Sequence, residues 1–175
     1  GPKHRLRDNR TVLMCAARNQ ATIETIEYII NSGADVNAVC NDDKTALHYL
    51  IQSKRQNIVD ILKLLIKNDV NVNHVPSVGL AHFDMVSPLM KMLTDARPRA
   101  DLVESVKQLI GAGANVNAKI SGETVLHKAF NNLEDPNMPE VIMLLVAAGA
   151  TANFDVTINV KDIIKIISRA DETRK

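Results

Sequence analysis

The chain has 175 residues, of which 46% are apolar and only 3% are aromatic. Twenty-one Lys and Arg residues balance 20 Asp and Glu residues, so the formal net charge is +1. This balance disfavours nucleic-acid binding, which usually shows as a basic surplus with aromatic stacking platforms. A core built from Leu, Ile, Val, Ala and Met favours stacked helices over a β-sandwich.

Further classes of protein are disfavoured by local features of the chain. No apolar run reaches the ~18 residues that a membrane span requires, and no signal peptide is recognisable. Cys15 and Cys40 are too few for a disulfide framework, and neither has metal ligands at a useful spacing. We therefore expect reduced thiols and an intracellular protein, in the cytoplasm, the nucleus or both.

The chain opens with a tag-like dipeptide and a short basic run. Gly1-Pro2 resembles the remnant of a cleaved expression tag, so we expect the natural protein to extend beyond both ends. The basic residues of the run are Lys3, His4, Arg5, Arg7 and Arg10. We interpret the run as a solvated end, with a phosphate-binding patch as the alternative.

A helix-opening signature recurs at Thr11, Thr45, Ser87 and Thr124, with a degenerate fifth copy at Thr157. Successive copies start 34, 42, 37 and 33 residues apart. In each of the first four copies, a Leu stands two residues after the Thr or Ser. A hydroxyl side chain at this point accepts an unsatisfied backbone N–H, so each copy predicts an N-cap and a helix that follows it.

A second signature, downstream of each cap, marks the end of a second helix. Its copies are Gly33-Ala-Asp-Val-Asn37, Asp69-Val-Asn-Val-Asn73, Gly113-Ala-Asn-Val-Asn117 and Gly149-Ala-Thr-Ala-Asn153. Glycine suits the left-handed residue that ends many helices. The Asn at the fifth position is expected to tie the returning loop through its side-chain amide.

Apolar columns connect the two signatures. Seven residues before each turn stand Ile26, Leu62, Val106 and Ile142, and further Ile, Leu and Val residues follow three and four positions later. These spacings place the side chains on one face of a helix. Each unit is therefore predicted to consist of a helix, a turn, a second helix and a returning loop. One helix pair cannot bury both its faces alone, so the units are predicted to stack as a solenoid.

Taken together, these motifs resemble ankyrin repeats. The resemblance rests on Thr-x-Leu-His at residues 45–48 and 124–127, on Ala16-Ala17, and on the Gly-Ala-x-Val-Asn turns, and it covers residues 6–168. It implies an all-α solenoid of stacked antiparallel helix pairs with finger loops, which binds protein through its concave face and fingertips. We divide the chain into a lead-in at 1–7, four repeats at about 8–40, 41–82, 83–119 and 120–156, and a C-terminal capping half-repeat with a polar tail at 157–175.

Three departures from the ankyrin pattern stand out. The connections between the two helices of a unit are extended at 53–57, 95–101 and 131–139, which predicts longer helices or enlarged loops. Larger residues, Leu50-Ile51 and Met92-Leu93, replace the small Ala pair and are expected to widen the stack. The loop between Asn73 and Ser87 is longer than its neighbours and contains the apolar residues Val75, Val78, Leu80, Phe83 and Met85.

Candidate chemistry is sparse. His48 and His127 occupy the same repeat position, where we interpret each as a structural imidazole bonded to backbone near the turn. His74 and His82, eight residues apart without nearby Cys or Glu pairs, make a poor metal site. Gly111-Ala-Gly113 lacks the Lys of a phosphate-binding loop. We therefore predict a non-enzymatic chain with no catalytic residue, no metal, no cofactor and no small-molecule substrate.

The leading hypothesis is a protein–protein interaction module. By the resemblance, the contact positions lie just before each cap and just after the first helix. The predicted partner-binding residues are Arg10, Arg18, Asp42, Lys44, Tyr49, Gln52, Phe83, Asp84, Val86, Asp95, Ile120, Glu123 and Asn131. Because their charges are mixed, no strongly acidic or basic partner is predicted. An apolar side chain of the partner is expected to dock near Phe83 and Tyr49, with the alternative that the long loop packs on the fingers.

Other hypotheses from the sequence remain open. The domain could regulate, or recruit substrates to, a larger enzyme or a ubiquitin-ligase adaptor. Nucleic-acid binding through the basic start is disfavoured but testable by its salt dependence. A monomer is expected unless the first unit self-associates through its uncapped face.

Overall fold

The described chain is a stack of helix pairs. The computed structural model describes residues 8–55, 58–77, 85–94 and 99–151. In these ranges the helices are α1 (Val12–Arg18), α2 (Ile23–Asn31), α3 (Ala46–Ile51), α4 (Val59–Lys67), α5 (Pro88–Thr94), α6 (Leu102–Gly111), α7 (Val125–Phe130) and α8 (Met138–Ala147). A two-stranded hairpin, β1 (Lys119–Ile120) and β2 (Glu123–Thr124), lies before α7.

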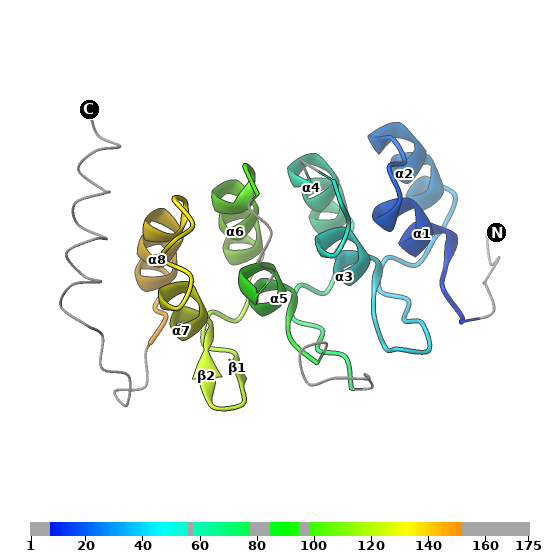
Figure 1. Ribbon diagram of the computed structural model, residues 1–175. Coiled ribbons are helices and arrows are strands. Elements are labelled where there is room, and N and C mark those ends of the chain that lie inside the picture. Colours follow the sequence, from blue (N-terminus) through cyan, green and yellow to red (C-terminus); the bar gives the residue numbers. More distant parts are fainter. Residues whose placement is uncertain (1–7, 56–57, 78–84, 95–98, 152–175) are drawn as a thin grey trace.

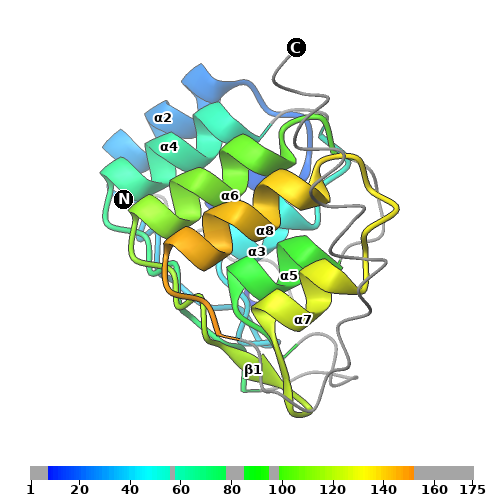
Figure 2. The same cartoon turned by 90° about the vertical axis from the view of Figure 1, so that its left-hand side faces the viewer.

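The helices form two layers. The first helices of the units, α1, α3, α5 and α7, form an inner row, and α2, α4, α6 and α8 form an outer row (Figure 1). Each inner helix packs on its own outer helix and on the inner helices of adjacent units. The loops that join the units project to one side of the helices as fingers (Figure 2). This is the predicted all-helical solenoid, with the short hairpin of β1 and β2 as the one addition among the described residues.

The predicted capping bond is present at three of the four predicted helix starts that the structure describes. The hydroxyl of Thr11 accepts the backbone N–H of Met14 at 3.2 Å, and that of Thr124 accepts the N–H of His127 at 3.4 Å. Ser87 accepts the N–H of Met90 at 3.3 Å. These bonds satisfy donors that the first turn of a helix leaves without an intrahelical partner.

The predicted ladder between the rows is also confirmed. Ile26, Leu62 and Val106 have exposed fractions of 0%, and Ile142 has 4%. All four belong to one continuous apolar core. Burying one such side chain contributes about 1.5–3 kcal/mol, so the ladder is a main source of the stack's stability.

The turns that end the outer helices take the predicted left-handed form, but their Asn residues act differently from expectation. Gly33, Gly113 and Gly149 have φ of 85–88°, and Asp69 has φ 58° in the same position. The expectation that each Asn ties its own returning loop is wrong, because the Asn side chains bridge to the next unit instead.

The bridge is the same at the three turns whose Asn the structure describes. The side-chain oxygen of Asn73 accepts the N–H of Asn115 at 2.7 Å, and its amide donates to the carbonyl of Gly113 at 2.9 Å. Asn37 bonds in the same way to the turn of the next unit, at 2.7 and 2.9 Å, and Asn117 does so at 2.8 and 3.1 Å. The repeated Asn therefore joins neighbouring units along one edge of the stack.

Between α3 and α4, and between α7 and α8, the described part of the extended connection is an enlarged loop, and the inner helices are not lengthened. Helices α3 and α7 have six residues each, one fewer than α1. The residues between α3 and α4, and between α7 and α8, lie outside helices where they are described. Leu50, Ile51, Met92 and Leu93 are all buried.

Arginines in the enlarged loops reach back to the preceding unit. The guanidinium of Arg55 donates to the carbonyls of Ala16 at 3.0 Å and Ala17 at 3.3 Å, near the end of α1. Arg99 donates to the carbonyl of Ile51 at 2.9 Å, at the end of α3. Each loop therefore binds carbonyls that the last turn of an inner helix leaves unsatisfied.

Parts of the predicted organisation lie outside the described residues. These are the capping half-repeat and tail at 157–175, the start at residues 1–7, and residues 78–84 of the long loop. The residues of that loop that are described include Val75 and Met85, with exposed fractions of 49% and 36%.

Candidate partner-binding face

The predicted contact residues that the structure describes gather along the inner row and at the base of the fingers. One group lies on the finger side, where the inner helices begin: Arg10, Asp42, Lys44, Ile120 and Glu123. A second group lies where the inner helices end: Arg18, Gln52 and Asn131. Phe83, Asp84 and Asp95 lie outside the described residues.

Tyr49 is not the exposed anchor that the sequence suggested. Its exposed fraction is 5%, and its hydroxyl lies 3.4 Å from Sγ of Cys40. Burial raises the pKa of the phenol, with Cys40 adding to the effect. Val86 is also buried, at 3%. Both positions face the packed side of their units, which the sequence pattern could not distinguish from the open side.

Tyr49 instead supports two arginines of the first unit. The guanidinium carbon of Arg10 lies 6.0 Å from the ring centroid, and that of Arg18 lies 5.9 Å from it. These distances are in the range of cation–π contacts. The buried ring therefore holds two cations on the inner face.

Carboxylates on the finger side are paired. Asp8 forms an ion pair with Arg10, and Glu123 forms one with Lys128. The hydrogen bond from Lys128 is the main reason that the pKa of Glu123 is lowered. The mixed charges seen in the sequence are thus partly neutralised within the molecule.

Asp43 joins two fingers and was missed by sequence reasoning. Its carboxylate accepts the N–H and the hydroxyl of Ser77, each at 2.8 Å, and lies 3.4 Å from Nε2 of His74. The backbone N–H of Ser77 is the largest of the contributions that lower the pKa of Asp43. Asp43 has φ 55°, in the left-handed region where Asp and Asn are enriched. The residue type, an Asp in a finger loop, was therefore the one sequence signal for this position.

The two repeated histidines are structural, as predicted. Nδ1 of His127 accepts the backbone N–H of Thr124 at 3.3 Å and lies 2.8 Å from its hydroxyl. His48 makes the same contacts with Thr45, at 3.3 and 2.9 Å. Burial lowers the pKa of His48 to about 4, and nearby His74 adds to the shift. No group of three His, Cys, Asp or Glu residues in the described parts of the chain could hold a metal ion.

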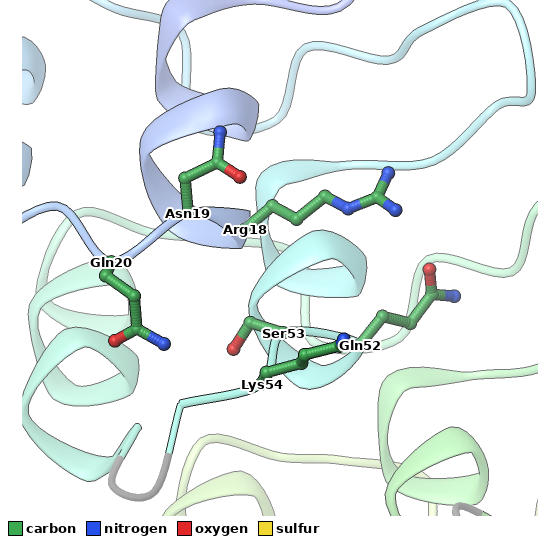
Figure 3. Close-up of a pocket in the computed structure, with 6 residues that line it drawn as sticks. All are labelled: Arg18, Asn19, Gln20, Gln52, Ser53 and Lys54. Atoms are coloured by element: carbon green, nitrogen blue, oxygen red, sulfur yellow. The ribbon is translucent and has the colours of Figure 1, made fainter.

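A pocket lies where the inner helices α1 and α3 end. It has a volume of about 380 Å³ and is lined by Arg18, Asn19, Gln20, Gln52, Ser53 and Lys54. The side chains come from the end of α1 and the end of α3, each with the segment that follows (Figure 3). The sequence predicted Arg18 and Gln52 as contact residues, but not Gln20 or Lys54, which lie farther into the connecting loops.

The fold is that of a helical repeat protein, and the candidate binding face lies along its inner row of helices. Comparison with known proteins identifies the repeat. Residues 1–75 match a family model described as ankyrin repeats in three copies, and the structures that superpose on the chain are ankyrin repeat domains. The chain therefore has the ankyrin-repeat fold, and its first 75 residues match the ankyrin-repeat family.

Two solved structures illustrate the likeness in fold. An ankyrin repeat domain from Acinetobacter baumannii superposes with a TM-score of 0.70 at 24% identity, over 86% of this chain and 70% of that one. The ankyrin repeat domain of Bcl-3, a member of the IkappaB protein family, superposes with a TM-score of 0.71 at 22% identity, over 96% of this chain and 72% of that one.

One similar sequence comes from a plant. A zinc finger CCCH domain-containing protein of Arabidopsis thaliana is 38% identical over 82 residues. The matched region is 46% of this chain but only 14% of the plant protein. Among the helices that the structure describes, none has the length and apolar character to cross a membrane.

Proposed function

We propose that this chain is a non-catalytic module that binds a partner protein or peptide along its inner helix row and finger loops. Ankyrin repeats generally mediate protein–protein interaction. The finer assignment, to this face and to these residues, is our own.

The observation that carries the proposal is the separation of repeating and non-repeating residues. The repeating columns, such as Leu62 and Val106, are buried between the rows. The residues that differ from unit to unit, such as Arg18, Gln52 and Asn131, occupy one equivalent position at the end of the inner helices and reach the surface there. Their variety is not needed by the scaffold, so a partner-specific surface accounts for it.

Exposed apolar residues on the fingers support the same face. Val39, Val75 and Met85 belong to the finger loops and have exposed fractions of 36–49%. An apolar contact flanked by charged and amide groups is a typical composition for a protein interface.

A second candidate is a regulatory or substrate-recruiting domain within a larger protein. The plant relative favours it, because the region similar to this chain makes up only a small part of that protein. The two candidates share one binding face and differ in what is attached to it. We further propose an intracellular location, since Cys15 and Cys40 are both free thiols.

The proposal is tested by selecting binders from a random peptide-display library on the purified, isotope-labelled chain, and then mapping them by NMR. A selected peptide should shift backbone amide signals of the inner helices and finger loops and leave the centres of α2, α4 and α6 unchanged. Failure to enrich any peptide, or signal changes confined to the outer row, would overturn the proposed function.

A further inference from the structure

The pocket between the ends of α1 and α3 has an unbalanced charge. Its lining provides two cations, Arg18 and Lys54, together with the side-chain amides of Asn19, Gln20 and Gln52 and the hydroxyl of Ser53. None of these six residues carries a carboxylate. The two cations and the amide N–H groups of Asn19 and Gln20 are hydrogen-bond donors, so this part of the lining suits an anion.

The position of the pocket would ordinarily oppose an anion, because the carbonyl end of a helix carries a partial negative charge. Here those carbonyls are already bonded. The Arg55 guanidinium donates to the carbonyls of Asn19 at 2.7 Å and Ala21 at 2.6 Å, besides those of the last turn of α1. Arg99 binds the carbonyl of Ile51 at the end of α3. The two arginines offset the negative ends of both helices that flank the pocket.

Arg18 is held in place without an acidic partner. Its guanidinium lies 5.9 Å from the ring centroid of the buried Tyr49, which limits its freedom while leaving its side chain exposed. Within the described ranges, neither Arg18 nor Lys54 forms an ion pair with a carboxylate. On the finger side of the same face, by contrast, Asp8 and Glu123 are paired with cations. The positive charges of Arg18 and Lys54 at the pocket are therefore not neutralised by a carboxylate of the described chain.

We propose that this pocket binds the carboxylate of an Asp or Glu side chain in a peptide segment of the partner. The inference rests on the proposed function and names the chemistry of the partner at one point of the face. Arg18 provides the planar guanidinium that suits a carboxylate, and Lys54 adds a second positive charge. The pocket's volume of about 380 Å³ suits a side chain with bound water.

The test uses the peptides selected on the unaltered chain. We expect them to be enriched in Asp or Glu, and their binding to weaken with added salt. Titration calorimetry should show about tenfold weaker binding to the double variant Arg18→Gln/Lys54→Gln, since each exposed charge pair contributes up to about fivefold. The same loss should follow when the peptide's acidic residue is replaced by its amide.

The matched control is Lys67→Gln/Lys107→Gln, which removes the same charge from exposed positions of α4 and α6. Its affinity should stay unchanged, and thermal unfolding of each variant shows whether the fold is intact. Two outcomes would overturn the proposal that the pocket binds a carboxylate and leave the proposed function unaffected. These are peptides that bind the inner row without acidic residues, and peptides that bind both double variants equally well. Binding only after phosphorylation of the peptide would replace the carboxylate by a phosphate and also overturn it. Absence of any selected peptide would overturn both proposals.

Discussion

The two edges of the stack connect adjacent units by different means. At the turn edge, Asn37, Asn73 and Asn117 make the same pair of bonds to the next unit. At the loop edge, Arg55 and Arg99 reach back to the preceding unit, from different places in their loops and with different partners. The turn edge uses the same pair of Asn hydrogen bonds in successive units, whereas at the loop edge the Arg hydrogen bonds differ from one unit to the next.

The two edges therefore differ in how much sequence variation they tolerate. The turn edge is set by a short motif, so every copy must satisfy the same backbone groups. The loop edge accepts insertions because any donor that reaches the helix-end carbonyls satisfies them. The carboxylate pocket proposed above lies at this variable edge, between two such loops.

The largest expected effect is at Arg99 on the loop edge. Arg99 and Asp101 form a buried ion pair, with side-chain exposed fractions of 6% and 9%, and Asp101 also accepts the N–H of Ile58 at 2.6 Å. Arg99→Met should lower the free energy of unfolding by about 3 kcal/mol, because it leaves a buried carboxylate without its cation. Urea unfolding measures this change.

A double variant isolates the cause. Arg99→Met combined with Asp101→Asn should recover part of the loss, since no unpaired charge remains. A loss below about 0.5 kcal/mol for Arg99→Met would place it among ordinary surface substitutions and remove the loop edge as a source of stability.

Acid should weaken the finger side of the structure first, through His48. The pKa of this imidazole is lowered to about 4 by burial, against about 6.5 in an unfolded chain. As the pH falls below about 6.5, the unfolded chain binds the proton before the folded chain does. Stability should therefore decrease by about 3 kcal/mol between about pH 6.5 and 4, as followed by urea unfolding at several pH values.

The matched variant is His48→Gln, which should flatten the profile in that window. The pKa of Asp43 is lowered from its usual 3.8, so its contribution to stability is lost mainly below about pH 5, after most of the His48 effect. An unchanged slope in His48→Gln between pH 6.5 and 4 would mean that another group causes the dependence.

At the turn edge, Asn73→Ala should cost about 1–2 kcal/mol of unfolding free energy. It removes both inter-unit bonds, and each contributes about 0.5–1.5 kcal/mol. Asn73→Asp keeps an oxygen that can accept the N–H of Asn115 and loses only the amide donor. If the Asp variant is destabilised as much as the Ala variant, the two bonds do not act separately.

The smallest expected effect is at Arg55, because ordering its long side chain costs conformational entropy that offsets part of the hydrogen bonding. Arg55→Ala should lower the free energy of unfolding by about 1 kcal/mol. Arg55→Lys should restore only part of this, because an ammonium group cannot span several carbonyls as the guanidinium does. Hydrogen exchange at the end of α1 should increase in both variants, and no change there would contradict the role of Arg55.

The fold could be predicted closely because its signals are local and repeated. Three- and four-residue spacings around Ile26 and Leu62 place these side chains on one helical face, and the structure buries them. The N-caps at Thr11 and Thr124 depend only on a hydroxyl and the first helical turn. The same motif in several copies makes the stacking itself predictable.

The binding face was predicted less well. Tyr49 and Phe83 were grouped as an exposed pair, yet Tyr49 lies under Arg10 and Arg18, and Phe83 is outside the described residues. The pocket escaped prediction because Lys54 and Gln20 belong to connecting loops with no repeat position. No sequence pattern indicates which loop residues of two units meet.

The helix pairs, their caps, their buried columns and the left-handed turns could be predicted from the amino-acid sequence, because each depends on residues within one or two helical turns of each other. The bonds of Asn37 and Asn73 to the next unit, and those of Arg55 and Arg99 to the preceding unit, became visible only in the folded chain. These contacts join residues more than thirty positions apart. Their geometry depends on how one rigid helix pair packs on another, which local spacing does not specify.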